Sequence, residues 1–207
     1  MNAFIESAKH FWLLYLLLVL LIILTAIVCK KAFAASARHS KEFNENLAKA
    51  KRAKELRDAY SVLTEEVIAG APADTLFEGT ALCLEAKCQK SEDTSAFYDS
   101  LSSAQKLVYA YFYLASDCAK GKLSDFFAQS KKPLTSDALA AAETILSSEA
   151  YTVVNDMYSR YDDDNEEVSV IPDEIAELDK KFKELTDGTD LFAAGGEYIK
   201  ANPKDFI

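Results

Sequence analysis

The order of apolar and polar residues divides the chain into an apolar run, an amphipathic stretch and a series of short helical segments. The run at Phe11–Cys29 reads FWLLYLLLVLLIILTAIVC and contains no charge, Gly or Pro. At a rise of about 1.5 Å per residue it would span about 28 Å as a helix, close to the ~30 Å hydrocarbon core of a bilayer. The pattern therefore predicts one transmembrane helix at 11–29, after a short tail at 1–10, and makes the lipid bilayer an expected partner.

Basic residues beside this run predict its orientation. Only Lys9 and the α-amine precede it, whereas Lys30, Lys31, Arg38, Lys41 and Lys49 follow it. The positive-inside rule then predicts a signal-anchored, single-pass protein of the bacterial inner membrane, with its N-terminus outside and its C-terminal domain in the cytoplasm. The alternative is cleavage as a signal peptide near Ala32–Ala35, which would leave a periplasmic or secreted domain.

Residues 30–71 form a predicted basic stem. From Ser40 to Ile68, apolar residues recur every three or four positions, as on one face of a helix. This stripe either packs on the following domain, pairs with another copy in a homo-oligomer, or belongs to a plain connecting helix. Gly70 and Pro72 end the predicted stem helix.

Residues 72–207 form a predicted α-helical domain. Helical segments are expected at 75–90, 103–120, 123–129, 135–146, 148–161, 172–185 and 190–201. Val168–Ile171 is the only β-branched run, and it is too short for a sheet. The predicted fold class is thus all-α: a single transmembrane helix, an amphipathic stem helix and a compact multi-helix domain.

Charge is distributed unevenly along the chain. Residues 1–70 hold 10 Lys and Arg against 7 Asp and Glu, a net charge of +3. Residues 71–207 hold 13 against 26, a net charge of −13. Phosphate backbones repel such a domain, so direct nucleic-acid binding is not expected and a basic protein partner is favoured. A solvated acidic surface without a partner is the alternative.

The residues that usually carry catalysis or hold metals are missing from the domain. His10 and His39 are the only histidines, no Cys-x-x-Cys pair occurs, and no glycine-rich phosphate loop is present. We therefore expect no catalytic residue, no metal, no cofactor and no enzyme activity. The cysteines at 83, 88 and 118 are expected to be reduced thiols in a cytosolic domain, or to form a disulfide in a periplasmic one.

Several segments carry a family resemblance. They are Leu101–Tyr109 (LSSAQKLVY), Gly121, Phe126-Phe127, Leu178–Phe182 (LDKKF) and Tyr198–Phe206 (YIKANPKDF). Together they resemble the bacterial domain of unknown function family 4375, a DNA-mimic-like family, over about residues 72–207. The family's run Asn-Asn-Gly-Gly-Phe-x-Gln-Phe-Phe reads AKGKLSDFF here, so that only Gly121, Phe126 and Phe127 match. The resemblance implies an all-α, often acidic domain without known catalytic machinery, and in at least one member type imitation of DNA's charge.

Acidic residues between and within the last helical segments form a candidate partner-binding patch. They are Asp162, Asp163, Asp164, Glu166, Glu167, Asp173, Glu174 and Glu177. Carboxylates spaced like phosphates present a similar field to a basic groove, although a solvated loop between helices has the same composition. The expected function is therefore that of a membrane-anchored acidic interaction domain that binds a basic protein without catalysis. A scaffold that oligomerises through its stem, or an enzyme of unknown reaction, is the alternative.

Overall fold

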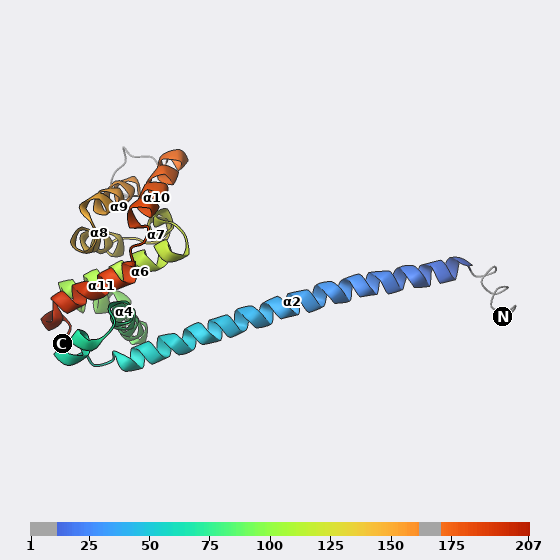
Figure 1. The fold of residues 1–207 in the computed structure, drawn as a ribbon, viewed down its shortest axis with the longest axis horizontal. Helices are drawn as coiled ribbons and strands as arrows, with labels where there is room; N and C mark the ends of the chain where they lie inside the picture. Colours follow the sequence, from blue (N-terminus) through green and yellow to red (C-terminus); the bar gives the residue numbers. More distant parts are fainter. Residues whose placement is uncertain (1–11, 162–170) are drawn as a thin grey trace. The chain divides into compact units, whose positions relative to one another are not determined.

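The computed structural model describes residues 12–161 and 171–207 (Figure 1). It divides into two units, Met1–Arg52 and Ala53–Ile207, which are considered separately; the finer division predicted at residues 10, 29 and 71 stays a prediction. In the described ranges every regular element is helical, which confirms the predicted all-α class. The elements are α2 (Trp12–Ala59), α3 (Glu65–Gly70), α4 (Ala73–Lys90), α5 (Thr94–Ser100), α6 (Ser103–Lys120), α7 (Leu123–Gln129), α8 (Leu134–Ile145), α9 (Ser148–Tyr161), α10 (Pro172–Thr186), α11 (Leu191–Ala201) and the 3-10 turn η1 (Pro203–Asp205).

The apolar run does not form an element of its own. It lies at the start of α2, which continues without a break through Lys30 and Lys31 into a strongly charged stretch. Among the residues that the structure describes, no helix combines the length and the apolar character needed to cross a membrane. This finding contradicts the predicted localisation as a single-pass inner-membrane protein and gives the predicted anchor at 11–29 no support.

The single stem helix predicted from Ser40 to Ile68 is also wrong, because α2 ends at Ala59. A separate helix, α3, follows the turn, and the Thr64 hydroxyl caps it by accepting a hydrogen bond from the Val67 backbone N–H at 3.3 Å. The apolar stripe divides at this break. Leu63 is partly buried against the domain core, whereas Phe43 and Leu47 are exposed. Homo-oligomerisation through the stripe stays a prediction.

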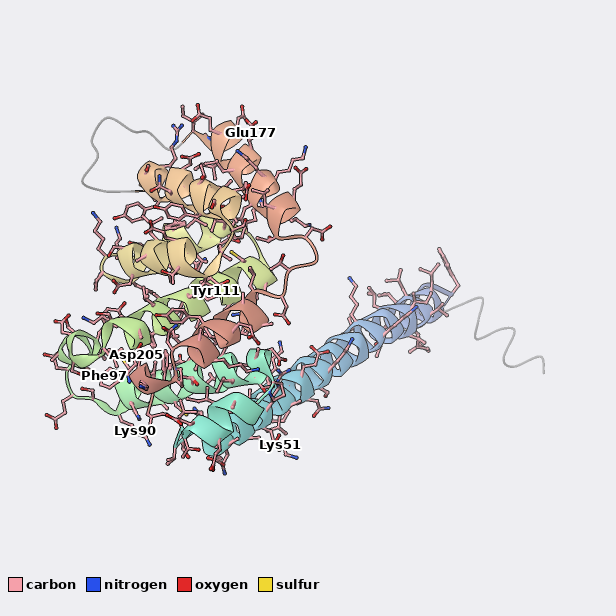
Figure 2. The ribbon with its side chains drawn as sticks, turned by 60° about the vertical axis from the view of Figure 1, so that its left-hand side comes forward. Lys51, Lys90, Phe97, Tyr111, Glu177 and Asp205 are labelled. Carbon is pink, nitrogen blue, oxygen red and sulfur yellow. The ribbon has the colours of Figure 1, made fainter. Side chains whose placement is uncertain are left out.

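Helix α6 lies at the centre of the unit Ala53–Ile207. Its start is fixed by a reciprocal pair of hydrogen bonds between Ser102 and Gln105, which satisfies two backbone N–H groups that the first helical turn leaves unpaired. Val108, Tyr111 and Leu114 are fully buried on α6, and Tyr111 lies inside the domain in Figure 2. Helices α4, α7, α8 and α11 all pack against α6.

Helix α11 approaches α4 closely through two adjacent glycines. A β-carbon on Gly196 would overlap the backbone carbonyl of Ala73, and one on Gly195 would lie 2.6 Å from the Phe77 ring. Only residues without a side chain permit this contact, which explains a Gly-Gly pair inside a helix. The pair therefore serves packing.

Helices α9 and α10 pack side by side, and α10 also contacts α7. Pro172 occupies the first turn of α10, where its missing N–H costs nothing. Ile175 and Phe182 turn one face of α10 into the core. The charged residues of α10 lie on its outer face and on its two flanks, and each flank lines a cavity.

Candidate functional site: two grooves beside helix α10

An open groove of about 630 Å³ runs between α9 and α10. It is called the acidic groove here, because three of its five charged residues are acidic. The residues that line it are Asp156, Ser159, Arg160, Glu174, Glu177, Leu178 and Lys181. Glu177 projects from α10 into solvent (Figure 2), so that its charge is available to a partner.

An ion pair joins the two sides of the acidic groove. The Arg160 Nη1 lies 2.6 Å from the Glu174 Oε2, and the two side chains are 34% and 45% exposed. Exposed pairs of this kind contribute roughly 0.2–1 kcal/mol. Glu174 and Asp173 also lie in the first turn of α10, where the helix dipole favours negative charge. These two carboxylates therefore stabilise the helix as well as charging its surface.

The structure brings together only part of the predicted acidic patch. Glu174 and Glu177 line the acidic groove, and Asp173 is exposed beside it. Asp162, Asp163, Asp164, Glu166 and Glu167 lie outside the described residues. Sequence reasoning missed Asp156 and Arg160, which reach the groove from α9.

The motif residue Gly121 ends α6. Its backbone N–H donates to the Asp117 carbonyl at 2.8 Å, and the next N–H, that of Lys122, donates to the Asp125 carboxylate at 3.0 Å. A β-carbon on Gly121 would overlap this carboxylate. Glycine therefore allows Asp125 to cap the start of α7 tightly against the end of α6.

The other motif residues, Phe126 and Phe127, belong to the core. They are 0% and 4% exposed, and their ring centroids lie 5.0 Å apart in an edge-to-face contact. The Phe127 ring also contacts the rings of Tyr158 and Tyr161 on α9, with centroids 6.1 and 6.3 Å away. The two buried rings thus pack α7 against α9, and they are not available as a binding surface.

Two hydrogen bonds tie the motif turn to α10. The backbone N–H and the hydroxyl of Ser124 donate to the two carboxylate oxygens of Asp179, at 2.9 and 2.7 Å. Ser124 is 8% exposed, so this contact is largely shielded from solvent. It fixes the start of α7 to the flank of α10 that faces away from the acidic groove.

A second cavity, of about 690 Å³, lies on that flank. It is called the lysine pocket because four lysines surround it: Lys120 at the end of α6, Lys122 just before α7, and Lys180 and Lys183 on α10. Apolar residues from several helices complete the lining: Ala115, Leu123, Phe182, Leu191 and Phe192. Burial, with a smaller contribution from nearby carboxylates, raises the pKa of the Cys118 thiol in this lining to about 12. The thiol is therefore protonated near neutral pH.

The acidic groove and the lysine pocket both lie within a segment that matches a known protein family. The family model described as DMP19-like protein matches residues 99–202, which is half of the chain. The chain belongs to the DMP19-like protein family. The predicted family resemblance is confirmed only as membership of the DMP19-like family. The numbered family 4375 and the imitation of DNA's charge stay predictions. The searches of curated proteins and of solved structures return no match.

The DMP19-like segment contains both grooves and no histidine. Carboxylates line the acidic groove on one flank of α10, and lysine ammonium groups surround the partly apolar lysine pocket on the other flank. Cys83, Cys88 and Cys118 are free thiols. Within the described ranges, no three His, Cys, Asp or Glu side chains are grouped to hold a metal ion. The predicted lack of metal and cofactor stays a prediction, because residues 162–167 lie outside these ranges.

Proposed function

We propose that the DMP19-like domain is a non-catalytic interaction module that binds a basic protein through the acidic groove and the adjoining start of α10. The observation that carries this proposal is the net charge of −13 over residues 71–207, together with exposed carboxylates around the groove. A surface of this sign attracts a cationic partner and repels nucleic acid.

The carboxylates beside the groove are free to meet such a partner. Asp156, Asp173 and Glu177 are exposed, and none of them forms an ion pair with a residue of the described ranges. Asp173 and Glu177 are four residues apart on α10, so they share one outer face at an axial spacing of about 6 Å. In the sequence, five further carboxylates lie between α9 and α10, at Asp162–Glu167.

The family resemblance favours one class of partner. A basic groove that normally holds DNA would accept a protein surface with regularly spaced carboxylates, because both present a similar field. We therefore expect the partner to be a DNA-binding protein, and we expect DNA to compete with this domain for it.

The test compares two variants that remove the same number of charges. Asp173→Asn/Glu177→Gln changes the proposed surface, whereas Glu92→Gln/Asp99→Asn changes exposed acids around α5. The tagged full chain is used to capture a partner, which is then purified for binding measurements. We expect the first variant to weaken binding about tenfold and the second to leave it unchanged, with binding falling as salt rises. Duplex DNA should displace the domain.

Three results would count against the proposal. Equal loss in both double variants would mean that only net charge matters. Binding that does not respond to salt would exclude charge complementarity as its basis. A partner that binds DNA and this domain at the same time would exclude competition for one groove.

A further inference from the structure

We propose that the lysine pocket binds an amphipathic anion, namely a carboxylate attached to an apolar body. This site uses the opposite charge and the opposite flank of α10 from the proposed partner surface. It is therefore independent of the function proposed above, and either can fail without the other.

The shape and lining of the pocket favour an apolar ligand body. Its volume of about 690 Å³ lies within the range of about 300–1,000 Å³ that is usual for small-molecule sites. Leu123, Phe182 and Phe192 provide an apolar wall drawn from three helices, α7, α10 and α11. A mostly apolar cavity with a few polar groups at its edge is the ordinary form of a ligand site.

The charge of the pocket favours an anion. Four lysines line it against two carboxylates, those of Asp179 and Asp190. Both carboxylates are already engaged: Asp179 accepts the two hydrogen bonds from Ser124, and Asp190 accepts from the backbone N–H groups of Phe192 and Ala193 at 2.9 and 3.1 Å.

The lysines are largely uncompensated. Lys120, Lys122 and Lys183 form no ion pair with any residue in the described ranges. Lys180 lies 3.8 Å from Glu184 in a pair whose side chains are 77% and 66% exposed, which an incoming anion can replace at little cost. A ligand carboxylate would therefore gain ammonium partners without having to break a strong contact.

The surrounding charge limits how large the anion can be. Residues 71–207 carry a net charge of −13, so a polyanion such as a nucleic acid would be repelled before it reached the pocket. A small ligand with one negative charge avoids most of this repulsion, and its apolar part matches the lining. A monocarboxylate with an aliphatic chain is the simplest compound with both properties.

Isothermal titration of the full chain with decanoate tests the proposal, and decanol is the uncharged comparison of equal chain length. We expect saturable decanoate binding that weakens as sodium chloride is raised. Decanol should bind at least tenfold more weakly. Equal binding of the two compounds would overturn the proposal, because the lysines would then play no part.

Variants locate the binding. Lys122→Gln/Lys183→Gln should weaken decanoate binding about tenfold, whereas Lys90→Gln/Lys204→Gln, which removes the same charge from exposed positions outside the pocket, should not. Ala176→Trp places a large ring at an exposed position of the pocket lining and should abolish binding. Circular dichroism checks that each variant is folded.

Two outcomes separate this proposal from the proposed function. If decanoate binds equally well to the pocket variants, it binds elsewhere on the chain and the proposal is wrong. If Asp173→Asn/Glu177→Gln retains decanoate binding while it loses the protein partner, the two flanks of α10 are separate sites, as proposed.

Discussion

The two flanks of helix α10 differ in charge although they belong to the same fifteen residues. Glu174, Glu177 and Lys181 face the acidic groove, whereas Ala176, Lys180 and Lys183 face the lysine pocket. Residues three or four positions apart share a side of a helix, so the 3.6-residue period sorts these charges onto opposite flanks. The net charge of a domain therefore does not forecast the charge of each of its surfaces.

The two flanks of α10 also differ in the contacts that join them to the neighbouring helices. The acidic groove is open, and among the described residues the contact that joins its two sides is the partly exposed ion pair between Arg160 and Glu174. The lysine pocket is bounded by the buried ring of Phe182 and by the shielded contact between Ser124 and Asp179. We therefore expect substitutions on the pocket side to cost more stability than substitutions on the groove side.

The largest effect is expected for Phe182→Ala. Phe182 is 3% exposed and packs α10 into the core, and removal of a buried Phe ring costs about 3–5 kcal/mol. Thermal unfolding followed by circular dichroism should show a midpoint lowered by roughly 10 °C. The control, Leu185→Ala, changes a side chain that is 37% exposed and should cost less than about 1 kcal/mol. If Phe182→Ala and Leu185→Ala lower stability equally, burial of the Phe182 ring does not make the pocket side of α10 the more stably packed side.

A smaller effect is expected for Asp179→Ala. This change leaves the Ser124 hydroxyl and N–H without their partner at a site that is 8% exposed, which costs about 1–3 kcal/mol. Asp173→Ala removes the same charge from an exposed position and should cost less than about 1 kcal/mol. Urea unfolding measures both. If Asp179→Ala is as stable as the wild type, the bond between α7 and α10 does not hold the pocket.

Most of the helices could be predicted because their signals are local. The predicted bounds of α6, α7 and α9 agree with the structure, since apolar periodicity and capping residues mark their ends. Helix α5 was missed because seven residues rich in Ser, Thr and Asp carry no periodic signal; the Asp93 carboxylate, which accepts from two backbone N–H groups, starts it.

The prediction of one stem helix was wrong because its end depends on a contact between residues far apart in the sequence. The pattern of apolar residues continues through Tyr60, but the Tyr60 hydroxyl is hydrogen-bonded to that of Thr75, fifteen residues away, at 3.0 Å. No local rule predicts such a contact. The acidic groove was half predicted, because Glu174 and Glu177 belong to an acidic stretch of sequence whereas Asp156 and Arg160 come from another helix.

The lysine pocket was not predicted at all. The spacing of Lys180 and Lys183 places them on one side of α10, and this was an available signal. Their approach to Lys120 and Lys122 depends on tertiary packing, and the count of charges over the domain concealed it.

The Cys118 thiol in the lining of the lysine pocket should make the stability of the domain depend on pH. An unfolded Cys118 thiol ionises near pH 9, whereas the folded one stays protonated up to about pH 12 because of burial, the main cause of its raised pKa. Above pH 9 the folded state binds more protons than the unfolded state, so stability falls as pH rises through this window. Between pH 8 and 10, wild type should lose about 1 kcal/mol more than Cys118→Ala in urea unfolding. Equal losses would place this thiol in contact with solvent.

The smallest effect is expected for the ion pair across the acidic groove. A double-mutant cycle with Arg160→Gln and Glu174→Gln should give a coupling energy of about 0.5 kcal/mol, because both side chains are partly exposed. The coupling should vanish in about 1 M salt, where screening is nearly complete. A coupling above about 2 kcal/mol that survives salt would describe a rigid bridge that closes the groove. A weak coupling has the opposite consequence for binding: a cationic side chain of the partner can replace Arg160 at Glu174 for about 0.5 kcal/mol, and the groove then presents Glu174 together with Glu177 and Asp156.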